Sequence, residues 1–152
     1  MKRSAELAPL SREHHVALEV SLRLRKATAS DADEVRARFL RFYEDEAREH
    51  FSAEEEFLLP AFARHVPPDD ADVVRVLVEH VELRRRAADV ARGIAGPSDL
   101  HALGHLLHDH VRHEERTLFP RIEAALDDEE LAVLGEQLHS ECAAQPPSSS
   151  PG

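Results

Sequence analysis

The segment HFSAEEEFLLP at residues 50–60 returns sixty residues later as HVRHEERTLFP at residues 110–120. In an α-helix, residues four positions apart lie on the same face. Each copy therefore places an imidazole beside a carboxylate, and the repeat predicts two equivalent helices. The two segments share residues at five positions: His50 and His110, Glu54 and Glu114, Glu55 and Glu115, Leu58 and Leu118, and Pro60 and Pro120.

Helical periodicity extends outward from these segments over most of the chain. Apolar residues recur at three- and four-residue steps, and no long stretch alternates with the two-residue period of a strand. Ser11 is a suitable N-cap for the first helix. Proline and glycine residues near positions 67 and 96 separate later helices. We predict helices over residues 11–29, 31–65 and 69–94, from the 96–99 boundary to about 126, and over 127–141.

Four long amphipathic helices with short connections predict an all-α protein, an antiparallel up-down-up-down four-helix bundle with a short C-terminal fifth helix. We assign residues 1–142 to one domain and expect residues 143–152, which end in QPPSSSPG, to form a disordered tail. Pro60 and Pro120 lie inside helical patterns, so each should kink its helix or end it locally.

Composition narrows the function classes. The formal net charge of -11 argues against nucleic acid or an anionic membrane as a partner, because both would repel this surface. The single cysteine, Cys142, excludes an internal disulfide and fits a reducing compartment. No segment resembles a signal peptide or reaches membrane-spanning length, so we expect a cytoplasmic protein.

Both repeated His–Glu pairs lie on the apolar stripe of their predicted helices, where leucine or isoleucine is expected. Burial of an unpaired carboxylate is costly, and a metal ion supplies the compensating charge. The two remaining long helices each offer one inward histidine, His14 and His80, and each follows a glutamate. The sequence therefore predicts six metal ligands: His14, His50, Glu54, His80, His110 and Glu114.

The order of these ligands is that of a duplicated helical hairpin, which gives a bundle a pseudo-two-fold axis. Such symmetry suits two metal ions with terminal histidines, and Glu54 and Glu114 would then span between the ions. Imidazole and carboxylate ligands without thiolate favour iron, with manganese or zinc as alternatives. Two redox-active ions can bind or reduce dioxygen or peroxide, whereas zinc cannot.

Several assignments stay open at this point. His14 continues the stripe of Leu10 and Leu18 and is preferred over His15. The internal repeat favours Glu114 over Glu115. Glu55 and Glu115 would either hydrogen-bond to ligating imidazoles or lie on the surface. Tyr43 would either pack in the core or donate a hydrogen bond at the metal site.

The chain resembles the hemerythrin family in its HHE cation-binding form. The resemblance covers about residues 10–126 and rests on SREHH at 11–15, VEH at 78–80 and the repeated segments. It implies a four-helix bundle with two non-haem iron ions joined by an oxo or hydroxo bridge. It also implies a small-molecule ligand such as dioxygen, peroxide or nitric oxide.

The pattern departs from that of the dioxygen-carrying members, which bring a fifth histidine on the third helix. The positions at that spacing from His80 are here Val76 and Arg84. Those carriers also use His-x-x-x-x-Asp on the fourth helix, where this chain offers Glu114 and Glu115. The resulting coordination is more open, which favours oxidation, peroxide chemistry or sensing over reversible dioxygen carriage.

We therefore expect a di-iron protein of hemerythrin type that acts in sensing, detoxification or iron handling. The alternatives are a di-iron oxidase or peroxidase, and a regulatory interaction module whose helix face responds to metal. Turnover of peroxide would distinguish the enzyme from a binding protein.

Overall fold

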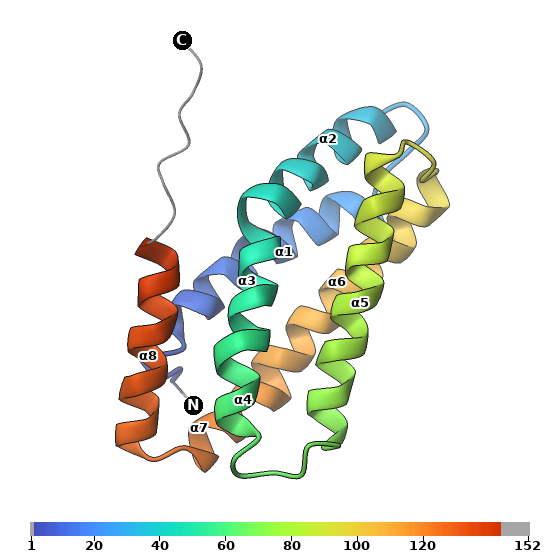
Figure 1. Ribbon diagram of the computed structural model, residues 1–152. Helices are drawn as coiled ribbons and strands as arrows, with labels where there is room; N and C mark the ends of the chain where they lie inside the picture. Colours follow the sequence, from blue (N-terminus) through green and yellow to red (C-terminus); the bar gives the residue numbers. More distant parts are fainter. Residues whose placement is uncertain (1, 144–152) are drawn as a thin grey trace.

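The computed structural model describes residues 2–143, and these residues form helices and no strand (Figure 1). The all-α prediction and the helical bundle are confirmed. Residues 144–152, which hold nearly all of the predicted tail, lie outside the described residues. No described helix combines the length and the apolar character needed to cross a membrane.

Each long predicted helix is present, although two of them are built from several pieces. The second segment comprises α2 (Ala32–Phe42), η1 (Tyr43–Ala47), α3 (Arg48–Ala53), η2 (Glu54–Leu58) and α4 (Leu59–Phe62), where η denotes a π-helical turn. The fourth comprises α6 (Pro97–His113), η3 (Glu114–Leu118) and α7 (Phe119–Ala125). The others are α1 (Ala8–Arg25), α5 (Ala71–Ala91) and α8 (Asp128–Ala143).

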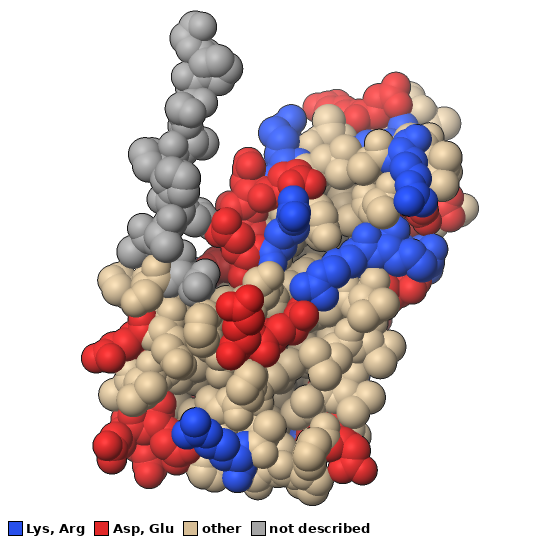
Figure 2. Space-filling view, in the orientation of Figure 1, with Lys and Arg blue, Asp and Glu red and all other residues tan. Residues whose placement is uncertain are grey.

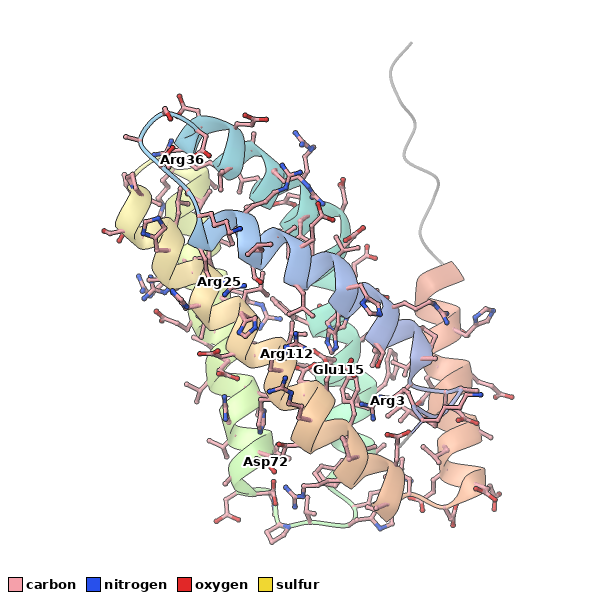
Figure 3. The ribbon with its side chains drawn as sticks, turned by 180° about the vertical axis from the view of Figure 1, so that it is seen from behind. Arg3, Arg25, Arg36, Asp72, Arg112 and Glu115 are labelled. Carbon is pink, nitrogen blue, oxygen red and sulfur yellow. The ribbon has the colours of Figure 1, made fainter. Side chains whose placement is uncertain are left out.

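Consecutive segments lie side by side, and the chain turns back at each connection (Figure 1). Helices α1 and α6 pack most closely, and Figure 3 shows them crossing near Arg25. A Cβ atom on Gly104 of α6 would lie 2.8 Å from the backbone nitrogen of Arg25. Glycine is therefore required at this crossing, because any side chain would push the two helices apart.

Two helix starts show how local chemistry sets the boundaries. Helix α1 begins at Ala8, three residues before the predicted start at Ser11, because Pro9 is favourable in a first turn. Helix α5 begins after Asp70, whose carboxylate accepts hydrogen bonds from the backbone N–H groups of Asp72 and Val73 at 3.0 and 3.3 Å. This cap satisfies donors that have no partner within the helix.

The prolines of the repeat widen their helices rather than ending them. In η2 the N–H of Leu59 donates to the carbonyl of Glu54, and in η3 that of Phe119 donates to Glu114. A proline follows each donor; it lacks an N–H, and its ring would clash with the carbonyl four residues earlier. The predicted local disturbance is present at each proline, but it is a π turn rather than a kink or a helix end. Such turns are frequent at functional sites.

The core consists of two apolar clusters with polar residues between them. One cluster contains Leu24, Phe39 and Leu103, and the other contains Leu58, Phe62 and Phe119. Along α1, His14 lies between Leu10 of the second cluster and Ala17 of the first. The buried histidines and glutamates of the repeat therefore occupy the middle of the bundle, where no solvent balances their charge.

Candidate metal centre

Four helical segments each place one histidine in the middle of the bundle, and two of them add a glutamate. Every one of these side chains is buried, and both carboxylates are fully so: Glu54 and Glu114 are 0% exposed. The histidines are His14 from α1, His50 from α3, His80 from α5 and His110 from α6, with exposures of 3, 7, 0 and 1%. The structure thus brings together all six residues expected from the sequence.

These side chains form two groups that share both carboxylates. The ligand atoms of each group lie within 4.8 Å of one another. An ion bound at about 2.1 Å from its ligands separates opposite ligands by about 4.2 Å, so each group has the size of one metal site. The first group is His14, His50, Glu54 and Glu114, and the second is His80, His110, Glu54 and Glu114.

The atoms that face the centre lack ordinary partners among the described residues. Both oxygens of Glu54 and of Glu114 are buried without a hydrogen bond, as are the Nε2 atoms of His80 and His110. The His110 Nε2 lies 2.8 Å from a Glu114 oxygen, but without the alignment of a hydrogen bond. Buried polar atoms are rarely left unsatisfied. Cations bound between them would satisfy all of these atoms, so the residues present fit a pair of metal ions.

The opposite ring nitrogen of every histidine is held by a carboxylate from a neighbouring helical segment. Because a carboxylate only accepts, each Nδ1 carries the proton and donates it. The Nδ1 to oxygen distances are 2.6 Å for His14 with Glu115, 2.7 Å for His50 with Glu13, 2.8 Å for His80 with Glu55 and 3.1 Å for His110 with Glu79.

This arrangement directs the Nε2 lone pairs of neutral imidazoles towards the centre. The Nε2 atoms of His14 and His50 face each other at 3.2 Å. Two lone pairs at that distance repel each other unless a cation or a proton lies between them. The outer carboxylates therefore set both the tautomer and the orientation that a metal ligand needs.

The outer carboxylates also follow the pseudo-two-fold symmetry of the repeat. Glu13 supports His50 as Glu79 supports His110, and Glu55 supports His80 as Glu115 supports His14. For Glu55 and Glu115 the sequence allowed either this role or a surface position, and the structure favours the first. Glu13 and Glu79 were not assigned from the sequence, although the recurring Glu-His dipeptide was a usable signal.

Two of the outer carboxylates also accept hydrogen bonds from arginines. Nη2 of Arg3 donates to Oε2 of Glu115 at 3.0 Å and to its backbone carbonyl at 2.8 Å, and Nη2 of Arg84 donates to Glu55 at 2.6 Å. Figure 3 shows Arg3 and Glu115 side by side. The Glu115 carbonyl is the acceptor that Pro120 leaves without a donor, since proline has no N–H. No pattern in the sequence pointed to Arg3 or Arg84.

The pKa shifts show how strongly the centre demands positive charge. Burial by itself lowers the pKa of His110, but the Glu114 carboxylate and a hydrogen bond to Glu79 outweigh it and raise that pKa to about 10. Burial by itself raises the pKa of Glu114, but His110 and His14 bring that pKa well below its ordinary value. Without a metal, protons on the imidazoles balance the carboxylates, and a bound cation would displace these protons.

The hemerythrin HHE cation-binding domain matches residues 6–122 of this chain. The chain belongs to that family. The match covers the whole of the buried His–Glu cluster, and the recognition made from the repeated segments is confirmed. A search of curated proteins and a search of solved structures gave no match.

The structure also separates the remaining candidates of this hemerythrin-family chain. His15 is exposed, so only His14 reaches the cluster. Tyr43 stacks on Phe39 with ring centroids 6.0 Å apart and packs against the first apolar cluster, which favours the core role over a role at the metal site. His113 is buried beside Glu114, but its Nε2 contacts Asp72 at 2.8 Å rather than the ligand groups.

Proposed function

We propose that this hemerythrin-family protein holds two non-haem iron ions and binds or reacts with dioxygen, peroxide or nitric oxide. The observation that carries the proposal is the pair of histidine groups that share Glu54 and Glu114. His14 and His50 would hold one ion, His80 and His110 the other, and the two carboxylates would span between them. We also propose that the bundle has the up-down-up-down topology predicted from the sequence.

The side chains of such a site have different roles. Glu54 and Glu114 supply negative charge where the ions need it, in a dry environment that strengthens every electrostatic contact. The outer carboxylates hold the imidazoles in position and keep their protons on Nδ1. The two apolar clusters exclude water from both ends. Iron would supply the electrons for chemistry with small oxygen or nitrogen species.

The proposed redox chemistry, rather than the affinity of the donor set, favours iron or manganese over zinc. Four imidazoles and two carboxylates would accept any of these ions. A site that holds two ions with only six protein ligands leaves open positions for a small ligand, and iron or manganese could use these positions for redox chemistry. We place the protein in sensing, detoxification or iron handling on this basis.

The test is metal content and the absorption spectrum of protein expressed with added iron. We expect about two irons per chain and near-ultraviolet bands that bleach on reduction and return in air. Two results would contradict the proposal: protein that contains only zinc, or colourless metal-free protein whose melting temperature does not change when a chelator is added. Continuous consumption of peroxide in proportion to iron would indicate an enzyme rather than a binding protein.

A further inference from the structure

Two cavities lie in series on one side of the candidate metal centre. The outer cavity, of about 490 Å³, lies between α1, the η1–α3 region and the last turns of α8. Its wall includes exposed residues such as Glu49 and His139, so it opens to solvent. In Figure 2 acidic side chains gather in the upper left part of the molecule, beside the end of α8. The inner cavity, of about 20 Å³, is lined by His14, His50 and His110.

The inner cavity is lined mostly by buried side chains. Nine of its eleven lining residues are buried, and the two that are partly exposed are Glu13 and Glu46. These two glutamates and His50 are also the residues that line both cavities. The two cavities therefore adjoin at these side chains, and a molecule that crosses from the outer cavity to the metal ligands there passes Glu13 and Glu46.

The two glutamates differ in how firmly they are held. The Glu13 carboxylate is fixed by the hydrogen bond from Nδ1 of His50 at 2.7 Å. Oε2 of Glu46 is buried and has no hydrogen-bond partner among the described residues. Burial and the neighbouring Glu13 and Asp45 raise the pKa of Glu46, and the attraction of Arg38 only partly offsets them. Glu46 can therefore move without breaking a hydrogen bond of its Oε2, whereas Glu13 cannot move without releasing His50.

The sizes of the cavities select the ligand. A volume of about 20 Å³ exceeds the roughly 10–15 Å³ that one water molecule needs, and leaves no room for an organic substrate. Apart from the three histidines and two glutamates, the walls are alanine, valine, leucine and phenylalanine side chains, which favour a neutral molecule over an anion.

We propose that Glu46 is the gate through which a neutral ligand of two or three atoms reaches the metal pair from the outer cavity. This inference rests on the proposed function and specifies its ligand class and its route. Glu46 would have two separable effects, because its side chain blocks the passage by its bulk and repels anions by its charge. Its place in the π turn η1, one turn before His50, holds it over the opening.

The test compares binding rates of nitric oxide, which is neutral, and azide, an anion, to iron-loaded protein in stopped-flow measurements at pH 8. Glu46→Ala removes the bulk and the charge, and it should raise both association rates about tenfold. Glu46→Gln keeps the bulk and removes the charge, and it should raise the azide rate several-fold more than the nitric oxide rate. Metal content and thermal melting of each variant establish that the site is intact.

Glu49→Ala is the matched control, because Glu49 lines only the outer cavity and is exposed. Both of its rates should stay within about twofold of wild type. Equal acceleration in Glu46→Ala and Glu49→Ala, or unchanged rates in Glu46→Ala, would overturn the gate while leaving the proposed function standing. Absence of binding in wild type and in every iron-loaded variant would overturn both.

Discussion

At the scale of single residues, the site depends on carboxylates in two positions. Glu54 and Glu114 stand where ions would lie between them, and four outer glutamates hold the imidazole Nδ1 atoms. The inner residues were predictable, because histidine and glutamate on an apolar stripe violate the usual pattern. The outer partners were only partly predictable, since a contact between helices depends on their packing angle as well as on sequence.

The first prediction concerns Glu54. Glu54→Ala removes a carboxylate from both ligand groups, so metal content should fall from about two ions per chain to one or fewer. The measurement is elemental analysis of protein loaded with iron and freed of excess metal. Glu56→Ala is the matched control, because Glu56 lies in the same π turn and is exposed. Full metal content in Glu54→Ala would show that this carboxylate is not a ligand.

A second prediction concerns the outer carboxylates. Glu115→Gln leaves a neutral amide beside the Nδ1 of His14 and should weaken metal binding by roughly 10- to 100-fold. Competition with a chelator of known affinity measures the change. By the pseudo-two-fold symmetry, Glu55→Gln should have an effect of similar size through His80, and the exposed Glu49→Gln should have none. Wild-type metal affinity in both variants would mean that these glutamates do not contribute to metal binding.

At the scale of helices, the structure keeps the predicted order but changes the boundaries. The sequence predicts each long helix from its apolar period, and its loops from proline and glycine. The π turns η2 and η3 were foreseen only as local disturbances at Pro60 and Pro120. Whether a helix ends or widens before a proline depends on the packing that follows, here the buried Leu59 and Phe119, which local pattern does not contain.

The start of α5 provides a prediction of pH dependence. Arg121 donates to both carboxylate oxygens of Asp70 at 2.9 and 2.8 Å, and this ion pair, ahead of the backbone cap, lowers the pKa of Asp70 from 3.8 to about 2. A carboxyl group with a depressed pKa contributes stability above its unfolded value and loses it as the pH falls towards the folded value. The contribution of Asp70 should therefore disappear between about pH 4 and pH 2.

Two variants separate the cap from the ion pair. Asp70→Ala should cost about 1 kcal/mol at pH 7, because the cap of α5 is lost. Asp70→Asn keeps a capping oxygen and should cost less, and both variants should show a weaker fall in stability than wild type between pH 4 and pH 2. Urea unfolding followed by circular dichroism measures these differences. Equal acid sensitivity in wild type and Asp70→Asn would exclude a role for this ion pair.

At the scale of the whole molecule, the bundle consists of two apolar clusters separated by a buried layer of histidines and glutamates. Duplication of a helical hairpin explains why the ligands, their outer carboxylates and the π turns η2 and η3 repeat, whereas η1 has no counterpart in α6. The sequence shows the duplication directly, and it therefore predicts the composition of the site. It does not show the cavities or the position of Glu46, because these arise where α1, η1, α3 and α8 meet in space.

The central claim is that two ions lie between Glu54 and Glu114, each with its own pair of histidines. Anomalous diffraction at the iron edge from iron-loaded crystals tests this most directly. We predict two peaks, one beside His14 and His50 and the other beside His80 and His110, both within bonding distance of the shared carboxylates. A single peak, or iron bound only elsewhere on the chain, would contradict the account.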